Sequence, residues 1–295
     1  MFEKIKAKLI FGKLLSRPNI NKAYAMVGPE DSWYNTIKKV HESLDEIKKL
    51  PHEIIEIKSS DGLTLQGIYY PAKEKSDKTV ICIHGYSSHA EREWAFPGLF
   101  YHSLGFNVLI PYQRAHGLSE GNKITFGMLE SSDMIKWIER VNEITPSGKI
   151  LIHGLSMGGG IALALSDRSE LASVKGIIAD APTPSVESFF YNVSKDIFGK
   201  NGHLVAKCAI DDINRYTGLE AANFNFVETV KNSAFPILLS AGSLEKCEET
   251  FDKIRQNNPC DTEIIILEGC NHGNGMYKQT EVYQNKIKAF INKYF

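Results

Sequence analysis

The sequence predicts an α/β fold in which a mostly parallel central sheet is flanked by helices and carries an inserted helical cap. From Thr79 onward, short aliphatic runs alternate with longer segments of helical periodicity. The aliphatic runs have too little polar alternation for strands with one solvated face, so they suit strands buried on both faces of a parallel sheet. The runs are TVICIHG, NVLIPY, KILIHG, VKGIIADAP, FPILLSAG and TEIIILEG.

Residues 1–50 are expected to form a helical arm ahead of the main domain, residues 51–295. The clearest helical pattern is YNTIKKVHESLDEIKKL, where apolar residues recur every three or four positions until Pro51 ends the helix. Phe2, Ile5 and Leu9 also stand near helical spacing among lysines, a pattern that suits an anionic membrane surface. Docking on the chain's own domain is the preferred interpretation, and membrane contact is the alternative. The lysines are Lys4, Lys6, Lys8 and Lys13.

The main domain is expected to begin with an antiparallel hairpin. Two extended runs in HEIIEIKSSDGLTLQGIYYPA flank the turn residues Ser60, Asp61 and Gly62. With 295 residues, 43% of them hydrophobic, the chain can bury the core of one large domain or of a domain with an insertion.

One interval between predicted strands is too long for a single connecting helix. Residues 183–232 separate IADAP from FPILLSAG and are expected to form a helical cap above the sheet. The cap aromatics are expected mostly to pack against the domain, with some lining a pocket for an acyl group. They are Phe189, Phe190, Tyr191, Phe198, Tyr216, Phe224 and Phe226.

Charge, cysteine spacing and hydropathy narrow the class of partner. A formal net charge of -1 provides no broad basic surface for nucleic acid, so the expected partner is a small molecule. Five widely spaced cysteines without a CxxC pair indicate neither a disulfide framework nor a zinc site. No apolar run approaches the roughly 20 residues that span a bilayer, and the start has no signal-peptide pattern, so a cytoplasmic location is expected.

The segment KILIHGLSMGGGIALAL carries the strongest chemical signal. It places Gly-x-Ser-x-Gly, with Ser156 at its centre, between a buried strand and an apolar helix. A sharp strand-to-helix turn lifts the serine hydroxyl above the sheet, and it needs nearly side-chain-free residues two positions before and after. Gly154 and Gly158 meet this requirement. Ser156 is therefore the predicted nucleophile.

A serine nucleophile also needs donors for the oxyanion that forms on the substrate. His84-Gly85-Tyr86 follows the predicted strand TVICI, where the small glycine lets the chain turn. The backbone N–H groups of Tyr86 and Met157 are the predicted oxyanion hole.

His272 is the predicted general base. It lies in LEGCNHGNGMY, a glycine-rich loop between the last predicted strand and the final helix, where the chain order Ser, acid, His requires it. His84, His116 and His153 lie close to other strand ends, and hydrogen bonds there are expected to satisfy them.

The acid that orients the histidine is expected a few residues after FPILLSAG. Glu245, three residues after Gly242, is the first choice for this role. Glu248 is an alternative in the same segment, and Asp180 at the end of the preceding strand is another.

These motifs resemble the α/β-hydrolase superfamily and, within it, the serine-aminopeptidase-like group of esterases and peptidases. The resemblance spans about residues 52–295 and is strongest in HGYSSHA, PYQRAHGLSEG, GMLESSDMIKWI, GLSMGGG, FPILLSAG and GCNHG. It implies that Arg114, His116 and Gly117 shape the floor of the site. At the acid the family usually has Gly-x-x-Asp followed by a proline turn, whereas this chain ends the motif with Glu245 and lacks the proline.

The expected function is that of a serine hydrolase acting on a small-molecule ester or amide. Ser156 attacks the carbonyl, His272 serves as base and then as acid, and Glu245 orients His272. This chemistry requires no metal and no organic cofactor. Carboxylic ester hydrolysis is preferred, while peptidase, amidase and thioesterase activities stay open. A non-catalytic binding protein with the same fold is the alternative from a different class.

Overall fold

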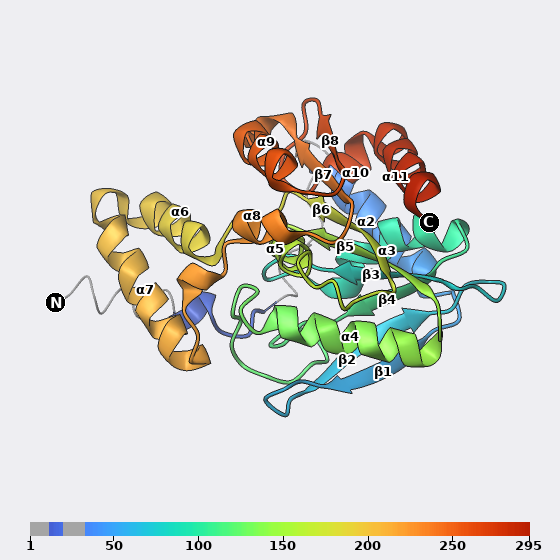
Figure 1. Ribbon diagram of the computed structural model, residues 1–295, viewed down its shortest axis with the longest axis horizontal. Helices are drawn as coiled ribbons and strands as arrows, with labels where there is room; N and C mark the ends of the chain where they lie inside the picture. Colours follow the sequence, from blue (N-terminus) through green and yellow to red (C-terminus); the bar gives the residue numbers. More distant parts are fainter. Residues whose placement is uncertain (1–11, 20–32) are drawn as a thin grey trace.

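The computed structural model describes residues 12–19 and 33–295, and these contain one eight-stranded sheet (Figure 1). Its strands are β1 (Glu53–Lys58), β2 (Thr64–Tyr70), β3 (Lys78–Ile83), β4 (Asn107–Pro111), β5 (Lys149–Leu155), β6 (Val174–Asp180), β7 (Ile237–Gly242) and β8 (Thr262–Leu267). The order across the sheet is β1-β2-β4-β3-β5-β6-β7-β8. β2 pairs antiparallel with β1 and β4, and the other neighbours pair in parallel. The predicted hairpin and the mostly parallel sheet are confirmed.

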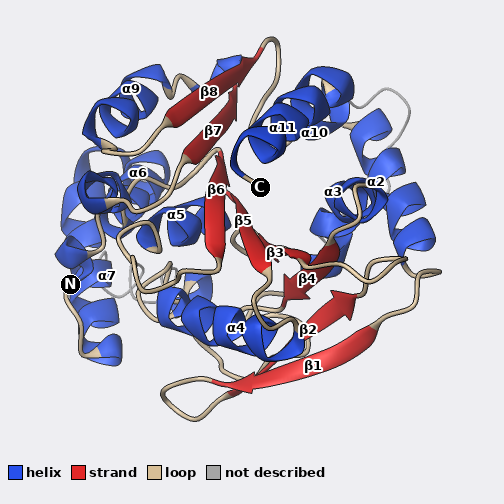
Figure 2. Ribbon diagram, turned by 45° about the vertical axis from the view of Figure 1, so that its right-hand side comes forward, coloured by secondary structure: helices blue, strands red, loops and turns tan. Residues whose placement is uncertain are grey.

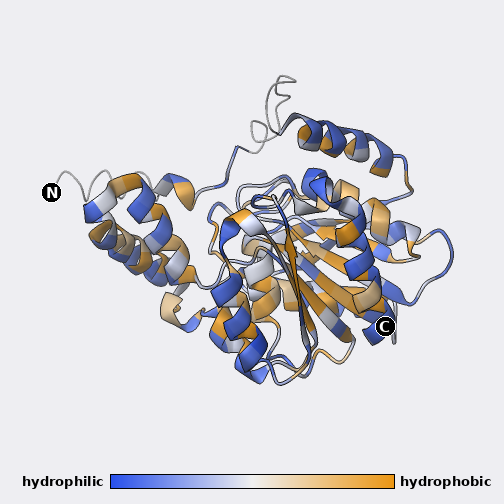
Figure 3. Ribbon diagram, turned by 90° about the horizontal axis from the view of Figure 1, so that it is seen from above, coloured by the Kyte–Doolittle hydropathy of each residue, from blue (hydrophilic) through white to orange (hydrophobic). Residues whose placement is uncertain are grey.

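Helices cover both faces of the sheet, which explains the aliphatic sequence of the central strands (Figure 2). One face carries α2 (Tyr34–Ile47), α3 (Ala90–Ser103), α10 (Gly275–Lys278) and α11 (Thr280–Tyr294). The other carries α4 (Glu130–Ile144), α5 (Met157–Ala164) and α9 (Glu248–Asn257). Each face has its own apolar cluster. Figure 3 shows hydrophobic strands at the centre and helices of mixed hydropathy around them.

The amphipathic helix predicted before Pro51 is α2, and it packs on α3. Val40, Leu44 and Ile47 are buried, as their helical spacing requires. Ile47 approaches α3 at Gly98, where a Cβ atom would lie 3.0 Å from the isoleucine Cδ1. The helix ends at Ile47, ahead of Pro51.

The segment assigned to a cap, residues 183–232, is helical in the structure. It contains α6 (Val186–Phe198), α7 (Gly202–Thr217) and α8 (Phe226–Thr229), which lie between β6 and β7 in the chain. In Figure 1, α6 and α7 extend to the side of the sheet. Phe226, 1% exposed, joins this segment to the main domain, because its ring occupies the space that a Cβ at Gly127 or Gly160 would need. Here the absence of a side chain permits close packing.

A short N-terminal segment, residues 12–19, lies against the turn after β4. The Arg17 guanidinium donates hydrogen bonds of 3.0 Å to the carbonyl oxygens of Gly117 and Gly121. Leu15 is buried in the apolar cluster that α4 and α5 share. The residues for which membrane contact was considered, Phe2, Ile5 and Leu9, lie outside the described residues together with Lys4, Lys6 and Lys8. Within the described ranges, no helix is both long enough and apolar enough to cross a bilayer.

Candidate active site

The carboxyl ends of the parallel strands bring the predicted site residues to one edge of the sheet. Ser156 follows β5, Glu245 follows β7 and His272 follows β8. Residues 84–88 follow β3 at the same edge. Segments far apart in the sequence meet here because parallel strands all end on one side.

Ser156 occupies the strained turn that its glycine neighbours predict. Its backbone has φ 58° and ψ -115°, a conformation that residues with a Cβ atom rarely adopt. A Cβ at Gly154 would lie 2.0 Å from the Gly158 carbonyl oxygen, and one at Gly158 would lie 2.0 Å from that of Ile83. Both glycines are therefore required for the turn to close.

His272 connects Ser156 to Glu245. The histidine Nε2 lies 2.9 Å from the serine Oγ, and Nδ1 lies 2.5 Å from Glu245 Oε2. With Nδ1–H donated to the carboxylate, Nε2 is the nitrogen that accepts the hydroxyl proton. Glu245 accepts this hydrogen bond and thereby raises the pKa of His272 above its ordinary value, because it favours the protonated ring.

Backbone geometry fixes the position of Glu245. The residue ends a single 3-10 turn, Ser243–Glu245, and its Oε1 accepts the Gly242 N–H at 2.9 Å. One carboxylate oxygen thus holds the turn and the other contacts the histidine. The Glu245 side chain is 17% exposed, whereas that of His272 is 55% exposed.

The structure brings neither alternative acid to the histidine. Asp180 is buried and accepts the Tyr283 hydroxyl at 2.8 Å, and burial raises the pKa of its carboxyl to about 6. Glu248 lies exposed in the first turn of α9, where an acidic side chain is favourable. Among the hydrogen bonds of the described residues, only Glu245 provides His272 with a carboxylate.

The segment that carries the predicted oxyanion donor passes directly beside Ser156. A Cβ at Gly85 would lie 3.4 Å from the Ser156 Cβ. Next in the chain, Tyr86 donates its hydroxyl to the Leu14 carbonyl at 2.9 Å and stacks on Phe126 with ring centroids 5.2 Å apart. Met157 begins α5, so its N–H has no acceptor in a preceding helical turn.

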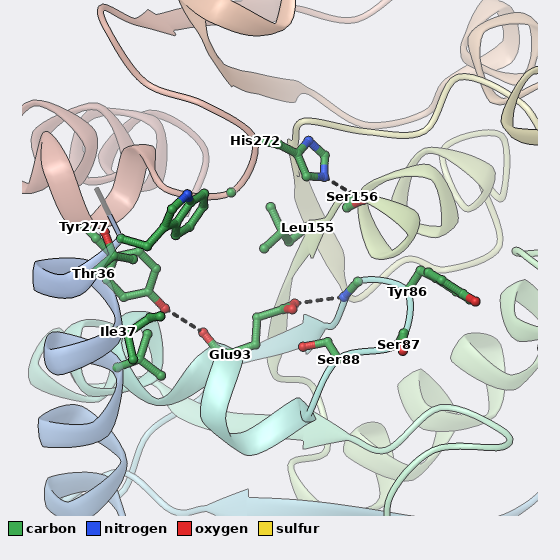
Figure 4. A pocket seen from close by; sticks show the side chains of 14 residues that line it. Thr36, Ile37, Tyr86, Ser87, Ser88, Glu93, Leu155, Ser156, His272 and Tyr277 are labelled. Carbon is green, nitrogen blue, oxygen red and sulfur yellow. Dashed lines mark hydrogen bonds between the residues drawn. The ribbon is translucent and has the colours of Figure 1, made fainter. Parts of the chain in front are cut away.

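A cavity of about 440 Å³ opens beside Ser156 and His272, and α2 forms one of its walls (Figure 4). Thr36 and Ile37 line it from this side, across from Ser156 in Figure 4, and Trp33 and Val40 also border it. The sequence reasoning left α2 outside the site. Its apolar periodicity was visible, but periodicity does not reveal that part of an apolar face borders a cavity while the rest packs on α3.

A second cavity, about 360 Å³, lies on the cap side of His272 and Glu245. Of the seven cap aromatics, Phe189 borders this cavity. Phe190 and Phe226 are buried in the core, and Phe189 also packs on Phe126 with ring centroids 4.1 Å apart. The rings of Phe189, Phe190 and Phe226 therefore pack residues 183–232 against the rest of the domain.

The motif expected to shape the floor of the site lies below it. Arg114 is buried and forms paired hydrogen bonds with Asp133 and Asp61. The His116 ring packs edge-on against His84, 4.6 Å between centroids. Neither residue, nor Gly117, borders the two cavities beside His272. This turn therefore supports the base of the loop at His84 and does not form a wall of either cavity.

His84 and His153 have the hydrogen bonds expected of them. His84 Nε2 accepts the Gln113 N–H at 3.2 Å, and His153 contacts the hydroxyls of Tyr101 and Tyr283 at 2.7 and 3.1 Å. Burial lowers the pKa of His153 to about 3. Throughout residues 12–19 and 33–295, no group of three histidine, cysteine or acidic side chains is arranged to hold a metal ion.

The comparisons with known proteins agree with this architecture. Residues 78–259 match the family model for the alpha/beta hydrolase fold. The Bacillus subtilis protein YqkD is 30% identical over 143 residues, which are 48% of this chain and 46% of YqkD. The chain thus matches about half the length of this curated relative.

Two solved structures share the fold at low sequence identity. The Pyrococcus furiosus esterase Pf2001 superposes with a TM-score of 0.66 at 21% identity, covering 95% of this chain and 98% of that one. A carboxyl esterase from Bacillus coagulans gives a TM-score of 0.60 at 17% identity, covering 83% and 99%. The family match, which spans more than half of the sequence, establishes that this chain belongs to the α/β hydrolase fold family.

Proposed function

We propose that this chain is a serine hydrolase that cleaves carboxylic esters through an acyl-enzyme on Ser156. The observation that carries the proposal is the position of His272, which contacts the Ser156 hydroxyl and the Glu245 carboxylate through its two ring nitrogens. A weakly acidic hydroxyl becomes a useful nucleophile when an oriented base accepts its proton.

The first half of the proposed reaction forms the acyl-enzyme. Ser156 Oγ bonds to the carbonyl carbon while its proton passes to His272 Nε2, and the carbonyl oxygen becomes an anion. The Tyr86 and Met157 N–H groups donate to this oxyanion. The bond from carbon to the alcohol oxygen then breaks, and His272 returns the proton to the departing alcohol. Glu245 stabilises the imidazolium throughout.

The second half releases the acid. A water molecule gives a proton to His272 and bonds to the acyl carbon, which again produces an oxyanion. The bond to Ser156 Oγ breaks, and the serine recovers its proton from His272. Each proton lost to the base is returned, so the enzyme is regenerated without a metal or cofactor taking part in the proposed cycle.

The choice of an ester with an apolar acyl group rests on the cavity beside the nucleophile. Ile37, Val40 and Leu155 contribute aliphatic surface to it, and we place the acyl group there. Two proteins of the same fold, Pf2001 and the Bacillus coagulans enzyme, are described as esterases, which supports the same choice.

A fluorophosphonate probe tests the nucleophile, and a substrate panel tests the reaction. We expect the wild type to label and Ser156→Ala to remain unlabelled. Among aryl and short-acyl esters, thioesters and aminoacyl amides, esters should give the highest kcat/KM. Faster amide or thioester turnover would replace the ester assignment, and a wild type that neither labels nor turns over any of them would favour a binding protein.

A further inference from the structure

Glu93 is a buried carboxylate in the candidate site that the proposed reaction does not use. It lies in the first turn of α3, is 6% exposed, and borders the cavity shared by Ser156 and His272. Buried carboxylates are uncommon unless a partner compensates them, so its contacts indicate what it holds.

Those contacts are at both ends of the loop formed by residues 85–88. Glu93 Oε1 accepts the Gly85 N–H at 2.8 Å, drawn as a dashed line in Figure 4. The Ser88 hydroxyl donates to the same carboxylate. Tyr86, the proposed oxyanion donor, lies between these two anchors, and Ser87 beside it has a φ of 56°. A loop with strained backbone needs such anchors to stay in one conformation.

The surroundings of Glu93 raise the pKa of its carboxyl towards neutral pH. Burial raises the pKa of its carboxyl to about 7, opposed by the Ser88 and Gly85 hydrogen bonds and by His272, and assisted by Asp180. The Tyr277 hydroxyl donates to the main-chain carbonyl of Glu93, so this bond does not occupy the Glu93 carboxylate that the loop contacts. The α2 residues lining the cavity are uncharged.

We propose that Glu93 is a positioning residue whose carboxylate fixes residues 85–88 and thereby directs the Tyr86 N–H at the oxyanion. The inference rests on the proposed hydrolase function. The Glu93 carboxylate accepts from both the Gly85 N–H and the Ser88 hydroxyl. When it is protonated, the carboxylic acid accepts more weakly and carries an O–H donor of its own, so the loop is held less firmly at acid pH. A displaced oxyanion donor lowers kcat more than it raises KM, because it acts in the transition state.

Glu93→Gln tests this because an amide is nearly isosteric with the protonated acid. Above about pH 8, we expect kcat for a neutral ester to fall about 10- to 100-fold with KM within about twofold. Near pH 5.5 the wild-type residue is itself protonated, so the two kcat values should converge to within about twofold. The Glu93 charge also raises the pKa of His272, so each kcat is taken from a full rate–pH profile and divided by the fraction of neutral His272 in that protein before the ratio is formed.

Glu91→Gln is the matched control. Glu91 lies in the same helical turn and is equally buried, but it accepts the Tyr70 hydroxyl at 2.7 Å and does not border the cavity. It should leave the pH dependence of kcat unchanged. A ratio of wild type to Glu93→Gln that is constant with pH, or the same pH dependence for Glu91→Gln, would overturn the proposal.

A second variant keeps the test decisive if Glu93→Gln unfolds. Ser88→Ala removes a hydrogen bond that lowers the Glu93 pKa, so the acid limb of kcat should move to higher pH. An unmoved limb contradicts the proposal. Fluorophosphonate labelling of the wild type separates the two claims: a labelled enzyme with a constant ratio overturns the role of Glu93 alone, whereas an unlabelled, inactive wild type overturns both.

Discussion

The two sides of the candidate site contain the same chemical group in different settings. The α2 wall, made of α2, the first turn of α3 and residues 85–88, supplies Glu93. The cap wall, made of α6 and residues 245–247, supplies Glu245. Each carboxylate accepts a main-chain N–H, but Glu93 is buried, whereas Glu245 is partly exposed and also contacts an imidazole ring. Burial and partner, not residue type, separate their proposed roles.

The walls also differ in how they join the domain. Phe190 and Phe226 attach the cap through buried rings, whereas α2 packs on α3 through Leu44 and Ile47 and leaves Ile37 beside the cavity. The buried aromatic rings on the cap side thus serve mainly to attach that segment to the domain. The wall with a modest aliphatic face borders the nucleophile, so we assign acyl selectivity to it.

The largest expected effect comes from replacing the proposed nucleophile or the proposed base, which both walls adjoin. Ser156→Ala and His272→Ala should each lower kcat about a million-fold, because the nucleophile and its base act as a unit. Steady-state hydrolysis of an aryl ester measures this loss. The double variant should be no slower than either single one, and additive losses would mean that the two residues do not act together.

The second-largest expected effect distinguishes the three candidates for the acid that orients His272. Glu245→Gln should lower kcat about ten-thousand-fold, since the amide no longer stabilises the imidazolium. Glu248→Gln, in the adjoining helix, should remain close to wild type. Asp180→Asn should act mainly on stability, through the lost Tyr283 contact. If Glu245→Gln stays active while either of the others collapses, the acid is misassigned.

A smaller effect compares the selectivity of the walls. Ile37 on α2 and Val193 on α6 are both branched aliphatic residues bordering the two cavities. Ile37→Trp should lower kcat/KM for octanoyl relative to acetyl esters about 10- to 100-fold by filling the acyl cavity. Val193→Trp should leave that ratio within about twofold. The opposite pattern would place the acyl group on the cap side.

The smallest effect is a displacement of the pH profile. The proposed base is neutral His272, whose pKa Glu245 raises above its ordinary value, so kcat/KM should fall as the pH drops through that raised pKa. Glu245→Gln removes the cause, and its residual kcat/KM should fall at lower pH. Rate–pH profiles of both proteins check the direction of this shift. If kcat/KM of Glu245→Gln fell at a higher pH than that of the wild type, Glu245 would be excluded as the group that raises the His272 pKa.

Local sequence patterns predicted the mostly parallel sheet and brought Ser156, His272 and Glu245 into consideration as site residues. Continuous aliphatic runs identify strands covered on both faces, and the glycines around Ser156 identify the turn that only small residues permit. Glu245 was predicted from its distance after β7, although the family that the motifs resemble usually has aspartate there, and in the structure its carboxylate contacts His272.

The α2 wall and Glu93 were missed because nothing local distinguishes them. An amphipathic helix looks the same whether its apolar face meets another helix or a cavity. Glu93 stands close to Glu91 in a helical first turn, where acidic residues are favoured for electrostatic reasons alone. Only the packing of α3 beside β3 turns one of these two glutamates towards residues 85–88.

The positive φ of Ser156 has a thermodynamic consequence for the evolution of this chain. A conformation of this kind costs on the order of 1–3 kcal/mol for a residue with a Cβ atom, and glycine adopts it freely. Glycine at position 156 would therefore relax the turn while removing the hydroxyl. Selection for stability alone would favour that exchange, so under the proposed function folding and chemistry make opposing demands at this position.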